Sequence, residues 1–127
     1  MKLLDTDVIV NHFQGHQPTL SFIADNLAAG EILAVSVVAL TELTSELRPK
    51  EAERLPRLVG LFLVLDVTEP ISRLAAVYLR QYRLSHHLEL GDALIAATAA
   101  HVLADLITHN LARYPMRDIR VIVPFGR

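Results

Sequence analysis

Short apolar runs alternate with longer amphipathic stretches from one end of the chain to the other. Runs rich in Leu, Val and Ile, which are typical of buried strands, occupy residues 2–5, 32–35, 62–67, 106–108 and 120–123. Between these runs the apolar positions follow helical spacing, as Leu40, Leu43 and Leu47 do. Apolar strands that alternate with helices predict an α/β fold of three layers, with a central parallel sheet of four to five strands flanked by helices.

Cap and turn residues set the expected helix boundaries. Thr6 and Ser36 are favourable at a helix start, Gly15 and Gly30 fit the positions after a last turn, and Pro56 interrupts or kinks a charged helix. We therefore expect helices over residues 6–13, 18–29, 36–48, 50–60, 69–83 and 91–103. Ligands of such parallel sheets bind beyond the carboxyl ends of the strands, so we expect the functional residues at that edge.

The composition indicates one globular domain over residues 1–127. Hydrophobic residues make up 52% of the chain and charged residues 20%, which excludes a disordered protein. No apolar run approaches the roughly 18 to 20 residues that cross a bilayer, and an acid at position 5 is inconsistent with a signal peptide. Because the chain also lacks cysteine, we expect a cytoplasmic protein without a membrane segment.

The net charge of −2 neither supports nor excludes a nucleic-acid partner. A basic face is the usual electrostatic footprint of such binding. If a few of the acids surround bound cations, however, the rest of the chain is close to neutral or slightly basic. Most of the 12 basic residues are arginine, which suits phosphate recognition.

Three acids are the candidate site residues. Asp5 ends the first predicted strand, Glu42 lies nearly two turns into the helix after the second strand, and Asp92 stands near the start of an alanine-rich helix. If these elements are neighbours, the carboxylates converge and repel one another unless protons or cations are bound. Oxygen ligands suit Mg²⁺ or Mn²⁺, which can polarise a phosphodiester and activate water. The simpler interpretation is that each acid caps a helix or lies on a solvated helix edge.

Other known patterns fit the chain less well. Haloacid-dehalogenase-like phosphatases and receiver domains share the early acids, but both need a lysine in the second half of the chain, where none occurs. His12 and His16 have a spacing that zinc can use. Gly15 between them favours a helix end, and no third ligand stands out.

Four segments of the chain form an ordered set of motifs. They are Leu3–Val10 (LLDTDVIV), Val35–Leu43 (VSVVALTEL), Gly91–Ala99 (GDALIAATA) and Leu106–Asn110 (LITHN), the last followed by Arg113-Tyr114 and by Val121–Pro124. In sequence, order and separation these segments resemble the motifs of PIN-domain ribonucleases, particularly the VapC toxins of type II toxin–antitoxin systems. The resemblance extends over essentially the whole chain, and its third motif is the most specific.

The resemblance implies a PIN fold, a homodimer, Mg²⁺- or Mn²⁺-dependent endonucleolytic cleavage of RNA, and inhibition by a VapB-like antitoxin. Asp5, Glu42 and Asp92 match the metal-binding acids of the family one for one. The family often has a fourth aspartate where this chain has Asn110, and we expect Asn110 or Asp7 to contribute to the metal site.

Two hydroxyl residues and one alternative function complete the expectations. Thr6 and Ser36 are candidates to hydrogen-bond the carboxylates, although capping their own helices is an equally good interpretation. Because Asn110 adds no negative charge, the alternative is a non-enzymatic PIN-fold module that retains the antitoxin or RNA interface without turnover. The sequence leaves open which RNA is cut, whether one or two metals bind, and which antitoxin is the partner.

Overall fold

Five parallel strands form one sheet in the order β3-β2-β1-β4-β5. They belong to a computed structural model that describes residues 1–125, so positions 126–127 of the predicted domain lie outside the described residues. The strands are β1 (Lys2–Leu4), β2 (Leu33–Ser36), β3 (Leu63–Leu65), β4 (Asp105–Ile107) and β5 (Val121–Ile122). The predicted parallel sheet is confirmed, and the strand that leads into Asp5 lies at its centre.

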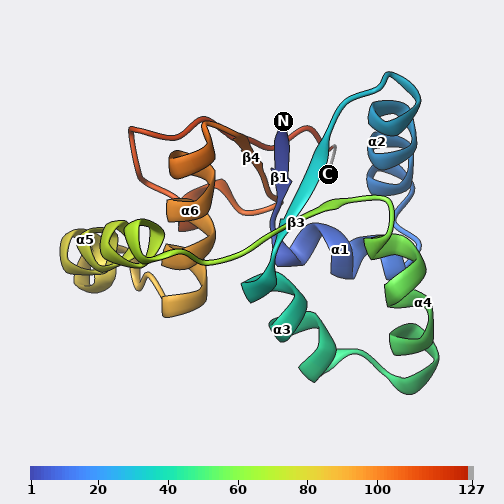
Figure 1. Ribbon diagram of the computed structural model, residues 1–127, viewed down its shortest axis with the longest axis horizontal. Coiled ribbons are helices and arrows are strands. Elements are labelled where there is room, and N and C mark those ends of the chain that lie inside the picture. The colour runs from blue at the N-terminus through green and yellow to red at the C-terminus, as the bar shows by residue number, and fades with distance from the viewer. Residues whose placement is uncertain (126–127) are drawn as a thin grey trace.

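Helices cover both faces of this sheet (Figure 1). They are α1 (Thr6–Phe13), α2 (Gln17–Ala28), α3 (Val37–Glu46), α4 (Pro49–Val59), α5 (Glu69–His86) and α6 (Leu90–Val102). In Figure 1, α5 and α6 pack together on one side of the sheet, and α1, α2 and α4 lie on the other. The start of α1, the start of α3 and the first turn of α6 lie near the carboxyl ends of the strands. The predicted three-layer α/β fold is therefore confirmed.

Several helix boundaries differ from the predicted ones by one or a few residues. Asp5, and not Thr6, is the N-cap of α1, because the Asp5 side chain accepts the Thr6 N–H. α4 continues past Pro56 as far as Val59. Gly15 has the left-handed backbone (φ 76°) that favours glycine after a helix.

β3 departs from the expectation of a buried strand. It lies at the edge of the sheet, where it pairs with β2 alone among the described strands. Leu63 and Val64 are consequently 46% and 39% exposed. The apolar sequence predicted a strand correctly, but it could not distinguish a central strand from an edge strand.

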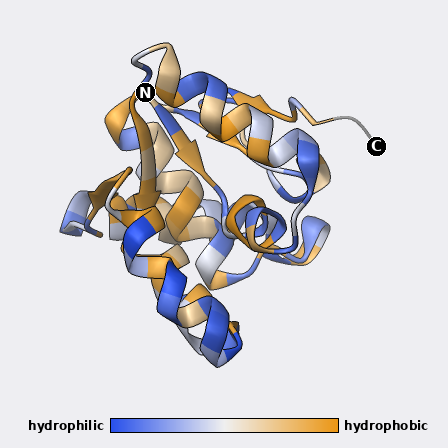
Figure 2. Cartoon of the chain, turned by 90° about the vertical axis from the view of Figure 1, so that its right-hand side faces the viewer, coloured by the Kyte–Doolittle hydropathy of each residue, from blue (hydrophilic) through white to orange (hydrophobic). Residues whose placement is uncertain are grey.

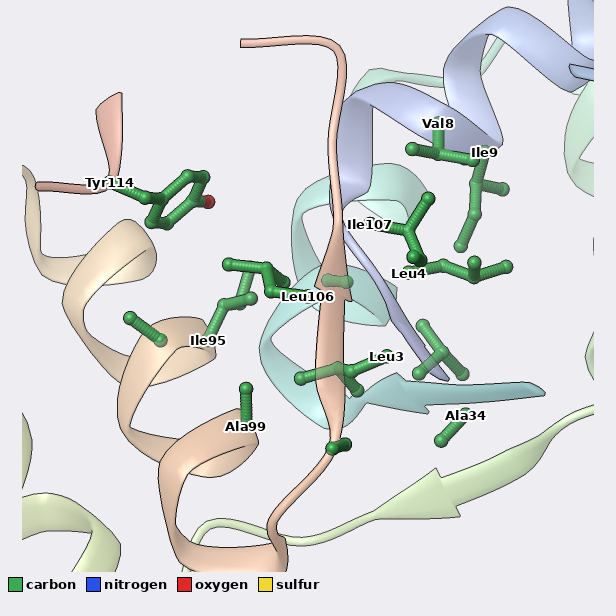
Figure 3. Close-up of a cluster of buried hydrophobic side chains, with 14 of the residues drawn as sticks. Leu3, Leu4, Val8, Ile9, Ala34, Ile95, Ala99, Leu106, Ile107 and Tyr114 are labelled. Atoms are coloured by element: carbon green, nitrogen blue, oxygen red, sulfur yellow. The ribbon is translucent and has the colours of Figure 1, made fainter. Parts of the chain in front are cut away.

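The core packs on both faces of the central strands, and α6 covers one of these faces. Leu3 and Leu106 on neighbouring strands are fully buried and face Ile95 and Ala99 of α6 (Figure 3). The many alanines of α6 allow its backbone to approach the sheet closely. Figure 2 shows hydrophobic residues gathered on the strands, with hydrophilic residues on the outer helix faces. No helix within residues 1–125 is both long and apolar enough to cross a membrane.

Candidate active site

Asp5 stands where β1 ends and α1 begins, and its carboxylate is almost completely buried. The residue is 1% exposed. Its Oδ1 accepts the Thr6 N–H at 2.8 Å, and its Oδ2 accepts the hydroxyls of Thr108 at 2.9 Å and Tyr114 at 2.7 Å. These bonds join β1 to the segment after β4. Asp5 thus caps α1, as the simpler interpretation of the sequence expected, and it also belongs to a polar cluster with Thr108 and Tyr114.

Glu42 lies on α3 and reaches both α1 and α6. Its Oε1 accepts the hydroxyl of Thr6 at 2.7 Å, so Thr6 bonds two of the predicted acids through its N–H and its side chain. Glu42 also packs against Gly91 in the first turn of α6, where an added Cβ would lie 2.9 Å from Glu42 Oε2. The absence of a side chain at Gly91 therefore makes room for this carboxylate.

Asp92 faces the same region from the first turn of α6. Its Oδ2 is 3.4 Å from the Glu89 N–H, and its Oδ1 is 3.5 Å from Arg113 Nη1. Burial raises the pKa of Asp92 to about 6, and the charge of Asp5 adds to the rise although Arg113 opposes it. The positive charge of Arg113 therefore does not compensate for the burial that disfavours ionisation of Asp92.

Asp7 is a fourth carboxylate in the cluster. Its Oδ2 accepts the His109 N–H at 3.2 Å and lies 3.3 Å from Thr108 Oγ1, whose single proton makes the shorter bond to Asp5 Oδ2. Its Oδ1 is buried and has no hydrogen-bond partner within residues 1–125. Burial, followed by the charge of Asp5, raises the pKa of Asp7 to about 6. The structure thus links Asp7 directly to the polar network around Asp5.

Asn110 occupies a more peripheral position. Its backbone N–H donates to Thr108 Oγ1 at 3.1 Å, and the residue is exposed. It lines a cavity of about 310 Å³ together with Glu42, Asp92 and Arg113. Of the two candidates for the fourth position, Asp7 is therefore bonded into the acidic cluster, and Asn110 lies on the wall of an adjoining cavity.

Two cavities meet at the acidic cluster. The first, of about 270 Å³, is lined by all four acids, Asp5, Asp7, Glu42 and Asp92. The second is the cavity that Asn110 lines, and it extends to the turn between α5 and α6. Glu42, Asp92 and Arg113 belong to the walls of both. A bound group could therefore contact the carboxylates and Arg113 at the same time.

The chemistry of these side chains fits a divalent cation. The donors are carboxylate oxygens, which Mg²⁺ and Mn²⁺ prefer. The raised pKa values of Asp7 and Asp92 and the unpartnered Asp7 oxygen indicate negative charge that the protein does not neutralise. Within residues 1–125, no three acidic or histidine side chains lie close enough to ligate one ion directly. A cation here would be held by one or two carboxylates and by waters, which is the usual coordination of Mg²⁺.

The remaining candidates are placed as follows. Ser36 Oγ accepts the Val38 N–H at 3.1 Å as the N-cap of α3, which favours the capping interpretation for this residue. The possible zinc pair is not formed, because α1 ends at Phe13, between the two histidines. His16 instead contacts the hydroxyl of Thr19 at 2.7 Å.

Three side chains that contact the acids were not among the candidate site residues of the sequence analysis. Thr108 and Tyr114 donate to Asp5, and Arg113 pairs with Asp92. Thr108 follows β4 at the same sheet edge as Asp5, and that position was a usable signal. Nothing in the local sequence indicates that Tyr114 points at a residue 109 positions away.

Comparison with known proteins agrees with the fold and the motifs. The PIN domain model matches residues 2–113. The curated protein Ribonuclease VapC19 of Mycobacterium tuberculosis is 37% identical over 117 residues, which cover 91% of this chain and 94% of that protein.

Solved structures have the same architecture. The crystal structure of FitAcB from Neisseria gonorrhoeae matches with a TM-score of 0.77 and 25% identity, covering 98% of each chain. A toxin–antitoxin complex from Klebsiella pneumoniae matches with a TM-score of 0.76 and 22% identity over the full length of both chains. Because the family model matches residues 2–113, which contain the four motifs and the four acids of the cluster, and the VapC relative covers 91% of the chain, the chain belongs to the PIN-domain family.

Proposed function

We propose that this chain is a divalent-cation-dependent endoribonuclease and the toxin of a toxin–antitoxin pair. The observation that carries the proposal is the cavity that Asp5, Asp7, Glu42 and Asp92 line at the carboxyl edge of the sheet. The similarity to Ribonuclease VapC19 over most of both chains supports RNA as the substrate. Because that substrate is RNA, we propose that the protein acts in the cytoplasm.

Asp5, Glu42 and Asp92 are the proposed ligands of Mg²⁺ or Mn²⁺, with Asp7 supplying additional charge. A cation held there would neutralise charge on the scissile phosphodiester and activate water for its hydrolysis. The carboxylates come from three separate elements, so their convergence depends on the packing of α1, α3 and α6. Asn110 remains a candidate ligand through its side-chain carbonyl.

Arg113 is the proposed contact for the RNA backbone. Its guanidinium lies 3.5 Å from Asp92 and belongs to the walls of both cavities. A planar guanidinium suits the oxygens of a phosphate group. The adjoining cavity also carries His86 and His87, so it offers polar contacts to a neighbouring nucleotide. The acids, through a bound cation, and Arg113 would then act on the same phosphate group.

The test is RNA cleavage by the purified chain with Mg²⁺, with Mn²⁺ and with EDTA. We expect cleavage only with a divalent ion, and we expect Asp92→Asn to abolish it. Asp66→Asn is the matched control, since Asp66 is exposed in the loop after β3. Activity that survives EDTA or the Asp92 substitution would refute the mechanism. Failure to bind Mn²⁺ in calorimetry would favour the non-enzymatic binding module.

We propose the cleft between α1 and α4 as the site of the antitoxin. Phe13, Leu58 and Leu61 contribute its apolar lining, and a cavity of about 520 Å³ lies there. Basic residues outnumber acidic ones along this cleft and its extension, namely Arg48, Lys50, Arg54 and Arg57 against Glu51 and Glu53. A partner segment that alternates apolar and acidic residues fits this surface. Leu61→Asp should abolish co-purification with the co-expressed antitoxin and leave RNA cleavage unchanged.

The homodimer implied by the family resemblance is also proposed. Val77 and Leu84 on α5 are 47% and 93% exposed, so we propose this helix as the surface that meets a second copy. Light scattering of the purified chain should give twice the monomer mass, and Leu84→Glu should reduce it to the monomer value. A wild-type monomer at working concentration would contradict the proposal.

A further inference from the structure

The Asp5 carboxylate has an unequal distribution of hydrogen bonds between its two oxygens. Oδ2 accepts two hydroxyls, from Thr108 at 2.9 Å and from Tyr114 at 2.7 Å, whereas among residues 1–125 Oδ1 accepts the Thr6 N–H alone, at 2.8 Å. Each carboxylate oxygen offers about two acceptor positions. Oδ2 is therefore saturated by the protein, and the remaining acceptor position of Asp5 is on Oδ1.

Tyr114 makes the shorter of the two bonds to Oδ2 from a buried position. The residue is 3% exposed, and Figure 3 shows its ring beside α6 with the hydroxyl oxygen pointing toward the strands. A phenylalanine would fill nearly the same volume, so the contribution specific to tyrosine is its hydroxyl. That hydroxyl has Asp5 as its partner, which connects the segment between β4 and β5 to the end of β1.

We propose that Tyr114 is a positioning residue that fixes the Asp5 carboxylate for metal binding and leaves Oδ1 as the oxygen available to a divalent cation. This role rests on the proposed function of the site. The bonds from Tyr114 and Thr108 restrain the rotation of the carboxylate about its Cβ–Cγ bond. A ligand restrained before the cation arrives loses less conformational freedom on binding.

The chemical nature of the donors supports this role. Hydroxyls are neutral, so they orient Asp5 and leave the negative charge that attracts the cation. A lysine at position 114 would cancel that charge. A phenolic hydroxyl is a hydrogen-bond donor at neutral pH without any help from its surroundings. Tyr114 therefore differs from its neighbour Arg113, whose charge competes with a cation at Asp92.

A second tyrosine in the chain provides a matched control. Tyr78 is also buried, at 2% exposed, and its hydroxyl also donates to a carboxylate, Asp118 Oδ2 at 2.7 Å. This pair joins α5 to the segment before β5, and neither residue lines the two cavities at the acidic cluster. Tyr78→Phe and Tyr114→Phe therefore remove the same kind of bond, but only one of the bonds is at the candidate metal site.

The experiment is calorimetric titration of Mn²⁺ into the intact chain after removal of metal with EDTA. We expect Tyr114→Phe to weaken Mn²⁺ binding about 10-fold, in the range found when a partner of a metal ligand is removed. We expect Tyr78→Phe to change the affinity less than about twofold. Thermal unfolding of both metal-free variants should show a loss of stability. We expect the smaller loss for Tyr78→Phe, because Asp118 is exposed and the Tyr78–Asp118 bond is only partly buried, whereas the Tyr114–Asp5 bond is buried.

Each outcome of the titration is decisive. Unchanged or tighter Mn²⁺ binding by Tyr114→Phe would overturn the positioning role while leaving the proposed function intact. A wild-type chain that binds no Mn²⁺ would overturn the proposed function and this role together. If Tyr114→Phe does not fold, Thr108→Val removes the other hydroxyl from Oδ2. It should also weaken binding, and unchanged affinity in that variant would contradict the proposal.

Discussion

Replacing Asp92 by asparagine should stabilise the metal-free protein at neutral pH, although the same change removes a proposed catalytic ligand. The Asp92 side chain is 14% exposed, and burial raises its pKa from 3.8 to about 6. A carboxyl group with a higher pKa in the folded than in the unfolded chain binds its proton more tightly when folded. The free energy of unfolding therefore falls as the pH rises from about 4 to about 6, and it stays lower above that range.

The size of the effect follows from the displacement of the pKa. Two pKa units at about 1.4 kcal/mol each give an upper limit of about 3 kcal/mol at neutral pH. Because the side chain borders an open cavity, solvent screens part of this cost, and we expect about 1–2 kcal/mol. Asparagine retains an oxygen that can accept the Glu89 N–H. For a domain of this size the gain corresponds to a rise in Tm of roughly 4–8 °C.

The assay is thermal unfolding followed by circular dichroism in EDTA at pH 7.5 and at pH 4. We expect Asp92→Asn to melt higher than the wild type at pH 7.5 and close to it at pH 4, where Asp92 is protonated in the folded protein. Asp66→Asn removes an exposed charge of the same kind and should change Tm by less than about 2 °C at either pH. A variant that melts at or below the wild type at pH 7.5 would refute the reasoning.

Three further substitutions test individual contacts of the site. Gly91→Ala should reduce RNA cleavage at least about 10-fold, because the added Cβ would lie 2.9 Å from Glu42 Oε2 and would push this carboxylate away. Its Tm should not fall, since alanine favours the helix. Unchanged cleavage would show that Glu42 can move without loss of activity. Ser36→Ala should cost about 1 kcal/mol in chemical denaturation through loss of the α3 cap, with Mn²⁺ affinity unchanged; a weaker affinity would favour a role near the metal. Asn110→Asp should tighten Mn²⁺ binding in calorimetry, and an unchanged affinity would exclude Asn110 from the metal site.

The order of the elements and the edge that carries the site could be predicted from sequence because both depend on local patterns. Alternating apolar runs and helical spacing identified all five strands and six helices. The parallel arrangement then brought Asp5, Glu42 and Asp92 to one edge, where they line a common cavity. These features follow from periodicity and connectivity, which a sequence shows directly.

The partners of each acid could not be predicted, because they depend on contacts between distant segments. Asp5 is bonded by Tyr114, and Glu42 fits against Gly91, yet neither pair is close in sequence. The N-cap of α1 differs from the predicted one for a related reason. Thr6 is a residue type that often caps helices, but the extended backbone of Asp5 places its carboxylate against the Thr6 N–H. Exposure of β3 likewise depends on which strand lies beside it.

The position of β1 between β2 and β4 has a consequence for synthesis on the ribosome. β4 pairs with the first strand of the chain, and the hydroxyls of Thr108 and Tyr114 reach Asp5 from the last twenty residues. A nascent chain that has emerged only as far as α6 therefore contains the four acids of the cluster. It still lacks β4 and the hydroxyls of Thr108 and Tyr114, which hold Asp5 in place. Competence to bind a cation should therefore appear only after β4 and Tyr114 have been synthesised and have packed against β1 and Asp5.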